Sequence, residues 1–332
     1  MRFNNYLREK IDHEKLNNFL VDNFGEHSFG KYLGKKTTKI AIVKSLLKKL
    51  IGYNGIERIL GKYHDRLQRL YDYLNQDDKK LLVKLMASRL LGYEKVKLPN
   101  NNKEYWEAAN LIDFLRKNAI SRKLNRPRLN LGKAGDDLNV YFKGLGIADT
   151  FIFEQYPYKN KNGETIVGVE DGDVVMDLGA CYGDTALYFA EKQGHVYFFE
   201  FTPSNITVFN ANVALDPRLM NQIQLVPHPV SNKSGQKIYF NDLVPGSRTA
   251  FAPFKAQTEE TTTISIDDFV KNNKISKVFF TKMDIEGAEL LALEGAVETI
   301  KKFKPKWAIA IYTQLGRFFR YSGMDSEPEF GL

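Results

Sequence analysis

The sequence predicts an α/β fold built on a parallel sheet in the C-terminal half of the chain, preceded by a mostly helical region. After Gly172, short apolar runs alternate with segments of helical periodicity, which is the pattern of successive β-α-β units. Before residue 125, apolar residues recur at helical spacing, as they do from Leu81 to Leu91. The chain has 332 residues, which is long for one core and favours two domains.

The individual elements follow from these periodicities. Helices are predicted at residues 40–51, 67–74, 81–91 and 105–118. Alternation through Leu138, Val140 and Phe142, and again at Phe151 and Phe153, predicts a β-hairpin. The later strands are predicted at Val174–Leu178, Val196–Glu200, Ile223–Val226, Lys237–Asn241, Val278–Met283 and Ala308–Tyr312, and the helices between them at Asp184–Lys192, Ser204–Leu215 and Ala288–Lys302. The predicted organisation is a helical accessory region at 1–130, a hairpin and connector at 131–168, the sheet domain at 169–312 and a tail at 313–332.

Charge is distributed unevenly between the two parts of the chain. Residues 1–130 hold 28 Lys and Arg against 14 Asp and Glu, whereas residues 131–332 hold 20 against 26. The basic part is able to meet an anionic partner such as nucleic acid, anionic lipid or a phosphorylated glycan. A solvated helical surface is the simpler explanation. Nucleic acid is disfavoured because the cations are scattered and no arginine cluster is interleaved with aromatics.

Targeting and redox signals are few. No apolar run is long enough to span a bilayer, and the N-terminus lacks the apolar segment of a signal peptide. The single cysteine, Cys181, excludes an internal disulfide and fits a reducing compartment. We therefore expect a cytoplasmic globular protein.

The strongest local motif lies at the end of the first sheet strand. Its sequence, VVMDLGACYGDT, takes a strand to the acid Asp177, through a turn with Gly179 and Gly183, and into a helix. Glycine leaves room for a ligand against the backbone, and the helix N-terminus offers unpaired N–H groups. The leading acid would repel a pyrophosphate but suits the ammonium of an amino-acid moiety. The candidate contacts are Asp177, Gly179, Ala180, Tyr182, Gly183, Asp184 and Thr185; the alternative is an ordinary strand-to-helix turn.

The next strand ends in a second acid, Glu200, which is 23 residues after Asp177. A carboxylate at this place is able to accept both hydroxyls of a ribose. Alone it would equally be a strand-end acid facing solvent, but its pairing with the glycine turn favours the binding role. Phe201 and Asn205 lie where neighbours of a bound nucleoside are expected.

A third motif, FTKMDIEGAE, brings Lys282, Asp284 and Glu286 to the carboxyl end of the sheet, where ligands bind in open α/β folds. Glu286 and Glu289 could instead stabilise a helix N-terminus through its dipole. That explanation covers part of Glu289, but it does not explain why Asp284 and Glu286 fall together.

These motifs together resemble the FkbM family of methyltransferases. The resemblance rests on VVMDLGACYGDT, FFEF, TISIDDFV and, most specifically, KMDIEGAELLALEGA followed by KPKWAIAIY, and it covers about residues 170–312. It implies a Rossmann-like fold, S-adenosyl-L-methionine as methyl donor, and O-methylation of a hydroxyl on a sugar, glycan or natural product. The helical N-terminal region resembles an accessory segment of some family members.

The donor implied by this resemblance leaves the enzyme to position the acceptor and remove its proton. Asp284 is the first candidate for the general base and Glu286 the second, and Lys282 completes the candidate catalytic set. Asp284 and Glu286 could instead bind a divalent cation, but no further acid cluster joins them and no metal is assigned. The alternatives are methylation of an amine or a nucleic acid, and a non-catalytic remnant that binds the donor without turnover.

The tail departs from the family pattern. After Tyr312 the resemblance implies a histidine and an acidic, aromatic helix start, whereas the chain continues TQLGRFFRYSG. A one-base shift in suitably chosen codons yields HNWED at that point. We therefore expect residues 313–332 to be a frameshift product and the terminal strands of the sheet to be missing, with activity in doubt.

Overall fold

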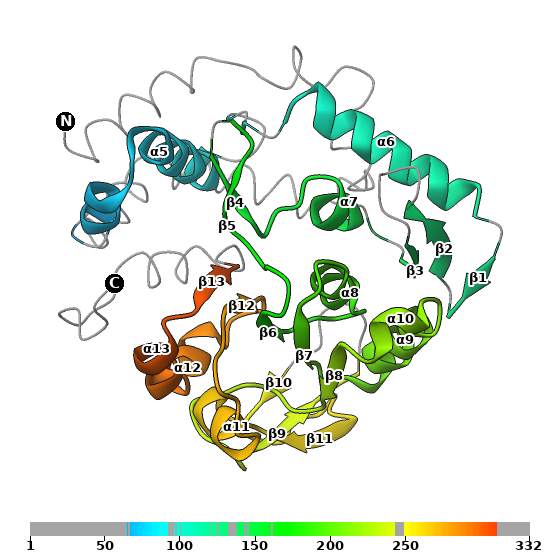
Figure 1. Cartoon of the computed structure of the whole chain (residues 1–332). Coiled ribbons are helices and arrows are strands. Elements are labelled where there is room, and N and C mark those ends of the chain that lie inside the picture. Colours follow the sequence, from blue (N-terminus) through cyan, green and yellow to red (C-terminus); the bar gives the residue numbers. More distant parts are fainter. Residues whose placement is uncertain are drawn as a thin grey trace. The chain divides into compact units, whose positions relative to one another are not determined.

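A computed structural model describes residues 65–310, apart from residue 66 and gaps at 92–95, 97, 100, 120, 125, 132–137, 143, 145, 161 and 243–248 (Figure 1). The predicted helix at 40–51 and the tail at 313–332 lie outside the described residues. The chain forms two compact units, residues 1–107 with 314–331, and residues 108–313. The domain boundaries drawn from the sequence stay a prediction.

The described part of the first unit is helical, as its periodicity predicts. Residues 67–73 are helical, and helix α5 (Gln76–Leu91) follows after a break at Leu74 and Asn75. The side chain of Asn75 produces this break, because its Oδ1 accepts the backbone N–H groups of Asp77 and Asp78, both at 3.0 Å. The next helix, α6 (Lys103–Lys117), begins in this unit and is capped in the same way by Asn102.

The second unit is built on a five-stranded parallel sheet with the order β13-β12-β6-β7-β8. Its strands are β6 (Val174–Leu178), β7 (His195–Phe199), β8 (Ile223–Val226), β12 (Phe280–Met283) and β13 (Lys306–Ile309). The chain runs from β6 outwards to β7 and β8, then returns to β12 on the other side of β6. This reversal is a topological switch point, and the Rossmann-like prediction is confirmed.

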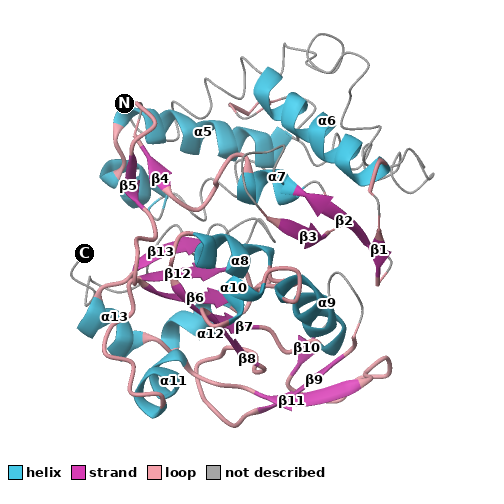
Figure 2. Cartoon of the chain, turned by 45° about the vertical axis from the view of Figure 1, so that its right-hand side comes forward, coloured by secondary structure: helices cyan, strands magenta, loops and turns pink. Residues whose placement is uncertain are grey.

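Helices cover both faces of this sheet (Figure 2). On one face Val175, Phe198 and Phe280 pack into a core with α8 (Asp184–Glu191) and α9 (Pro203–Val213). On the other face Met176 and Met283 pack into a second core. Its helices are α11 (Ile266–Asn272), α12 (Glu289–Glu294) and α13 (Val297–Phe303). The strands carry apolar residues on both faces because both faces are buried.

Smaller antiparallel elements complete the unit. One three-stranded sheet has the order β1-β2-β3 and another the order β10-β9-β11, and β4 pairs with β5. The bounds are β1 (Arg122–Lys123), β2 (Arg126–Asn130), β3 (Asn139–Tyr141), α7 (Gly146–Phe151), β4 (Tyr158–Lys159), β5 (Thr165–Val167), α10 (Pro217–Met220), β9 (Lys237–Phe240), β10 (Thr249–Ala250) and β11 (Glu259–Thr262).

Two predicted strands are placed differently by the structure. The strand predicted at Lys237–Asn241 is β9, which joins the antiparallel sheet and not the parallel one. The strand predicted through Phe151 and Phe153 is wrong, because Phe151 ends helix α7 and β3 pairs with β2 instead. Ile147, Ala148 and Phe151 are all buried, and their spacing forms one face of a helix. Across the described residues no helix is both long and apolar enough to cross a bilayer.

Candidate functional site

The glycine turn after β6 lies directly against the end of β12. Gly179 and Gly183 have φ angles of 75° and 79°, in the left-handed region that favours glycine. A Cβ atom on Gly179 would lie 2.1 Å from the carbonyl oxygen of Asp284, and one on Gly183 would lie 2.4 Å from the ring of Phe209. Both glycines therefore allow an approach of the turn to its neighbours that no other residue permits.

Asp177 and Lys282 form a buried ion pair beneath this turn. They are register partners on the parallel strands β6 and β12, so their side chains lie on the same face of the sheet. The Lys282 Nζ lies 3.1 Å from Oδ1 of Asp177 and donates to the carbonyl oxygen of Gly179 at 2.9 Å. Thr185 donates to the other carboxylate oxygen of Asp177. The pair thus ties two strands and the turn together.

Each charge of this pair stabilises the other and offsets the free-energy cost of removing both from water. Burial alone would lower the pKa of Lys282, but Asp177, Tyr156 and Asp284 raise it above its usual value, so the ammonium is retained. Burial raises the pKa of Asp177, and Lys282 and Thr185 oppose that rise. Asp177 has no exposed surface and Lys282 only 4%. This geometry favours a supporting role for both residues over direct contact with a ligand.

Asp184 is the second acid of the turn and begins helix α8. Its Oδ2 accepts the hydroxyl hydrogen of Thr150 at 3.2 Å. Burial raises the pKa of Asp184 to about 6, with Lys282 opposing the rise and Asp177 adding to it. The N-terminus of α8 has no side-chain cap, since it begins at Gly183. A raised carboxyl pKa beside uncapped N–H groups is frequent at binding sites, so Asp184 is a candidate ligand contact.

Glu200 follows β7 and is buried, so the alternative of a strand-end acid facing solvent does not hold. Its Oε1 accepts the backbone N–H groups of Phe201 and Thr202, both at 2.8 Å, and so fixes the turn that leads into α9. Its Oε2 accepts from Nδ2 of Asn205 at 3.1 Å. Burial raises the pKa of Glu200, and these hydrogen bonds oppose the rise. The Oδ1 of Asn205 is buried and has no hydrogen-bond partner among the described residues.

The acids after β12 are arranged differently from one another. Asp284 is half-buried, and its charge acts on both Asp177 and Lys282. Glu286 is exposed, with a φ of 50°. Glu289 is fully buried and accepts the backbone N–H of Gly287 at 2.9 Å. Glu289 therefore has the helix-start role predicted for it, whereas Asp284 lies against the glycine turn.

The remaining residues of the turn are packed into the unit. Ala180 is buried, and Tyr182 is 8% exposed and meets the ring of Phe142 edge to face. Phe201 packs edge to face on Phe240. Burial raises the pKa of the Cys181 thiol, which opposes formation of a nucleophilic thiolate.

Sequence reasoning missed two polar residues that hold the site. Asn212 in α9 is fully buried; its Oδ1 accepts the backbone N–H of Tyr141 at 2.6 Å, and its Nδ2 donates to the carbonyl of Tyr182 at 2.9 Å. Thr150 in α7 binds Asp184, as described above. Neither lies in a recognisable motif, so the only available signal was a polar residue inside an otherwise apolar helical face.

In the described ranges, no three or more His, Cys, Asp or Glu side chains are grouped as a metal ion would require.

Comparison with known proteins gives a family and several distant folds. Residues 177–327 match the family model described as the methyltransferase FkbM domain. A solved structure of methyltransferase FkbM from Methylobacillus flagellatus KT is 17% identical, with a TM-score of 0.46, over 79% of this chain and 52% of that one. This chain thus matches about half the length of that protein. No curated protein gives a significant match.

Two further methyltransferase structures are more distant. The C-terminal domain of precorrin-6Y C5,15-methyltransferase from Rhodobacter capsulatus is 11% identical, with a TM-score of 0.25 over 40% of this chain and 50% of that one. Coclaurine N-methyltransferase bound to N-methylheliamine and SAH is 18% identical, with a TM-score of 0.21 over 52% and 49%.

The family match also bears on the tail. It runs past Tyr312 to residue 327, which the frameshift hypothesis does not predict. Because residues 311–332 lie outside the described part, the missing terminal strands stay a prediction.

Proposed function

We propose that the chain is an S-adenosyl-L-methionine-dependent methyltransferase that O-methylates a sugar, a glycan or another hydroxyl-bearing small molecule, because residues 177–327 match the methyltransferase FkbM domain. The observation that carries this proposal is the set of groups at the carboxyl ends of β6, β7 and β12. There the glycine turn, Glu200 and Asp284 come from three neighbouring strands of one sheet.

The groups present fit the parts of this donor. The uncapped N-terminus of α8 suits a carboxylate, and Asp184 suits an ammonium. Glu200 keeps acceptor capacity beyond its three hydrogen bonds, and the unpaired Oδ1 of Asn205 lies beside it. Two adjacent acceptors match the two hydroxyls of a ribose.

The chemistry asked of this chain is orientation and proton removal. S-adenosyl-L-methionine, when bound, supplies a sulfonium methyl group that is already activated for transfer. Asp284 would take the proton from the acceptor hydroxyl as the new O–CH3 bond forms. Glu286 is the second candidate for this role. Lys282, buried under the turn, would hold Asp177 and Gly179 in place.

Calorimetric titration of S-adenosyl-L-methionine tests the proposal. We expect one site in the wild type and weaker binding in Glu200→Gln, which loses charge-assisted bonds to the ribose, typically about 1.5–3 kcal/mol or more than tenfold in Kd. Glu170→Gln is the control, because Glu170 is an exposed acid on the same unit. Failure of the wild type to bind the donor, or equal affinity in the two variants, would contradict the assignment. Donor binding without turnover on any acceptor would identify a binding remnant.

A further inference from the structure

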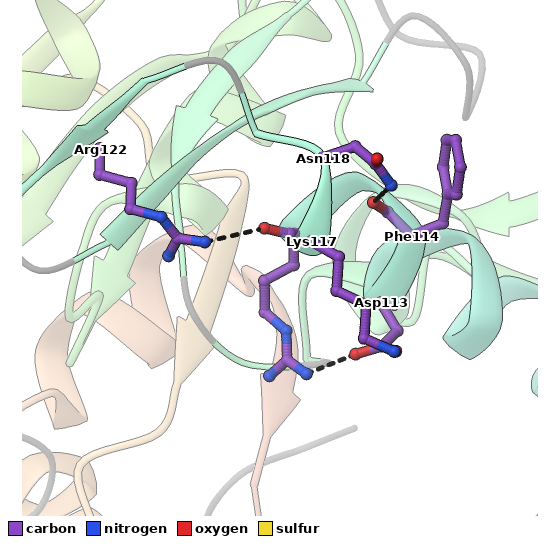
Figure 3. Close-up of polar contacts among 6 residues, drawn as sticks. Asp113, Phe114, Lys117, Asn118 and Arg122 are labelled. Atoms are coloured by element: carbon purple, nitrogen blue, oxygen red, sulfur yellow. Dashed lines mark hydrogen bonds and ion pairs between the residues drawn. The ribbon is translucent and has the colours of Figure 1, made fainter.

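The segment from the last turn of α6 through β2 is basic. From Phe114 to Gly135 the chain has seven Lys and Arg residues and no Asp or Glu. Part of this charge has partners within the protein. Arg116 and Lys117 both pair with Asp113, and Arg122 donates to the backbone carbonyl of Arg116 at 3.3 Å (Figure 3). These cations are explained by the end of helix α6.

Lys123 and Arg126 are not explained in this way. They are directly opposite each other in the antiparallel ribbon of β1 and β2. On β2 the next residues alternate, with Pro127 and Leu129 buried, so Arg126 lies on the outer face with Lys123. Like charges at opposed positions destabilise a sheet. Within the described ranges neither residue forms an ion pair.

Arg126 also lies against the glycine turn. Its guanidinium carbon is 4.1 Å from the centre of the Tyr182 ring, and Tyr182 belongs to the turn between β6 and α8. One terminal nitrogen donates to the carbonyl of Leu124 at 2.8 Å. The Nε is buried and has no hydrogen-bond partner among the described residues.

We propose that Lys123 and Arg126 bind an oxyanion, a phosphate or carboxylate group, carried by the methyl acceptor. An oxyanion between them would relieve the repulsion of the two cations and accept from the guanidinium of Arg126, and the ring of Tyr182 would fix the guanidinium plane. The acceptor is therefore an acidic sugar, glycan or small molecule. This inference rests on the proposed function in one respect, because it identifies the molecule that carries the oxyanion as the methyl acceptor.

The Nε–Hε resonance of Arg126 provides a direct measurement. The probes are inorganic phosphate and acetate, titrated into the full chain at constant ionic strength set with chloride. We expect a saturable shift of the resonance with at least one probe and none with chloride alone, and the responding probe identifies a phosphate or a carboxylate. Arg126→Met should weaken binding of that probe by about tenfold or more. Arg218→Met is the control, since Arg218 pairs with Asp216 on α10.

Lys123→Gln keeps the test valid if Arg126→Met does not fold. Removing one of two opposed cations should leave the anion-free protein at least as stable as the wild type, while its response to the probe weakens. A purely structural role for Lys123 would instead lower stability and leave the response unchanged, and this outcome would overturn the proposal.

Other outcomes are equally decisive. No response of Arg126 to either probe would overturn the proposal, as would an unchanged affinity of Arg126→Met for the probe, measured by calorimetry. Salt-sensitive binding of a short single-stranded oligonucleotide, with no response to the small anions, would identify a nucleic-acid surface instead. Donor titrations are separate measurements. Loss of donor binding with a retained Arg126 shift would remove the proposed function but leave the anion site.

Discussion

Replacement of Lys282 by Met should destabilise the protein strongly and in a pH-dependent way. The substitution removes the ammonium 3.1 Å from Oδ1 of Asp177 and its bond to the Gly179 carbonyl, while keeping most of the apolar stem. Removing one partner of a buried pair typically costs about 3–5 kcal/mol, because it leaves an uncompensated charge in a site without water. A domain is stable by about 5–15 kcal/mol, so the variant should fold with a much reduced margin.

The pH dependence follows from Asp177. Burial raises its pKa, and without Lys282 nothing on β12 of opposite charge opposes that rise. The folded variant then holds a proton that the unfolded chain releases, so its stability falls as pH rises above the unfolded pKa of Asp. The deficit relative to wild type should shrink from about pH 8 towards about pH 4, by at most about 1.36 kcal/mol per unit.

Urea unfolding at several pH values measures this effect. Lys237→Met is the matched control: its ion pair with Glu260 is 2.8 Å long, but both side chains are about half exposed, and the midpoint should barely change. Asp177→Asn combined with Lys282→Met should recover part of the loss, since no buried charge remains. A Lys282→Met deficit equal to that of Lys237→Met, or one that does not vary with pH, would refute the reasoning.

Three further predictions concern the turn and the acids around it. Asp284→Asn should lower turnover by about 10²–10⁴-fold while calorimetry shows unchanged donor affinity, and near-normal turnover would remove Asp284 from the mechanism. Gly179→Ala should lower the stability against urea more than Gly172→Ala. Both glycines have a positive φ, but only a Cβ on residue 179 would lie 2.1 Å from a carbonyl oxygen. Equal losses would show that the backbone strain of the positive φ accounts for the whole effect. The pKa of Asp184, raised to about 6, makes the protein more stable as pH falls from about 7 to about 4, and Asp184→Asn should flatten that rise.

The sheet strands were predictable because their apolar runs are buried on both faces. Strand β6 was predicted with the bounds that the structure gives it, Val174–Leu178. The sheet to which a strand belongs was harder to predict from the sequence. Strand β9 alternates in the same way whichever partner it has, and its partner β11, with the sequence EETT, is too polar and exposed to be recognised as a strand. Pairing is decided by contacts between distant segments, which local periodicity does not record.

The candidate site was predictable in its position but not in its internal pairing. The motifs correctly located the glycine turn, Glu200 and the acids after β12 at one edge of the sheet. That Lys282 pairs with Asp177 follows from β12 lying beside β6 in this register, and no sequence motif encodes that neighbour relation. Asn212 illustrates the same limit, because its two backbone partners, Tyr141 and Tyr182, come from segments far apart in the chain.

One acid therefore makes the turn recognisable in the sequence, and a different acid is best placed to meet a cationic ligand group. The first is Asp177, and the second is Asp184. Asp177 has no exposed surface, and Thr185 and Lys282 already face its two oxygens. Asp184 accepts from Thr150, stands at an uncapped helix start and has a pKa of about 6. An ammonium placed beside Asp184 would favour the ionised form of this carboxyl. Because the carboxyl is partly protonated near neutrality, part of the free energy of binding would be used to deprotonate it. The buried Asp177–Lys282 pair would instead hold the turn in the shape that presents Asp184, through the Lys282 bond to the Gly179 carbonyl and the Thr185 bond to Asp177.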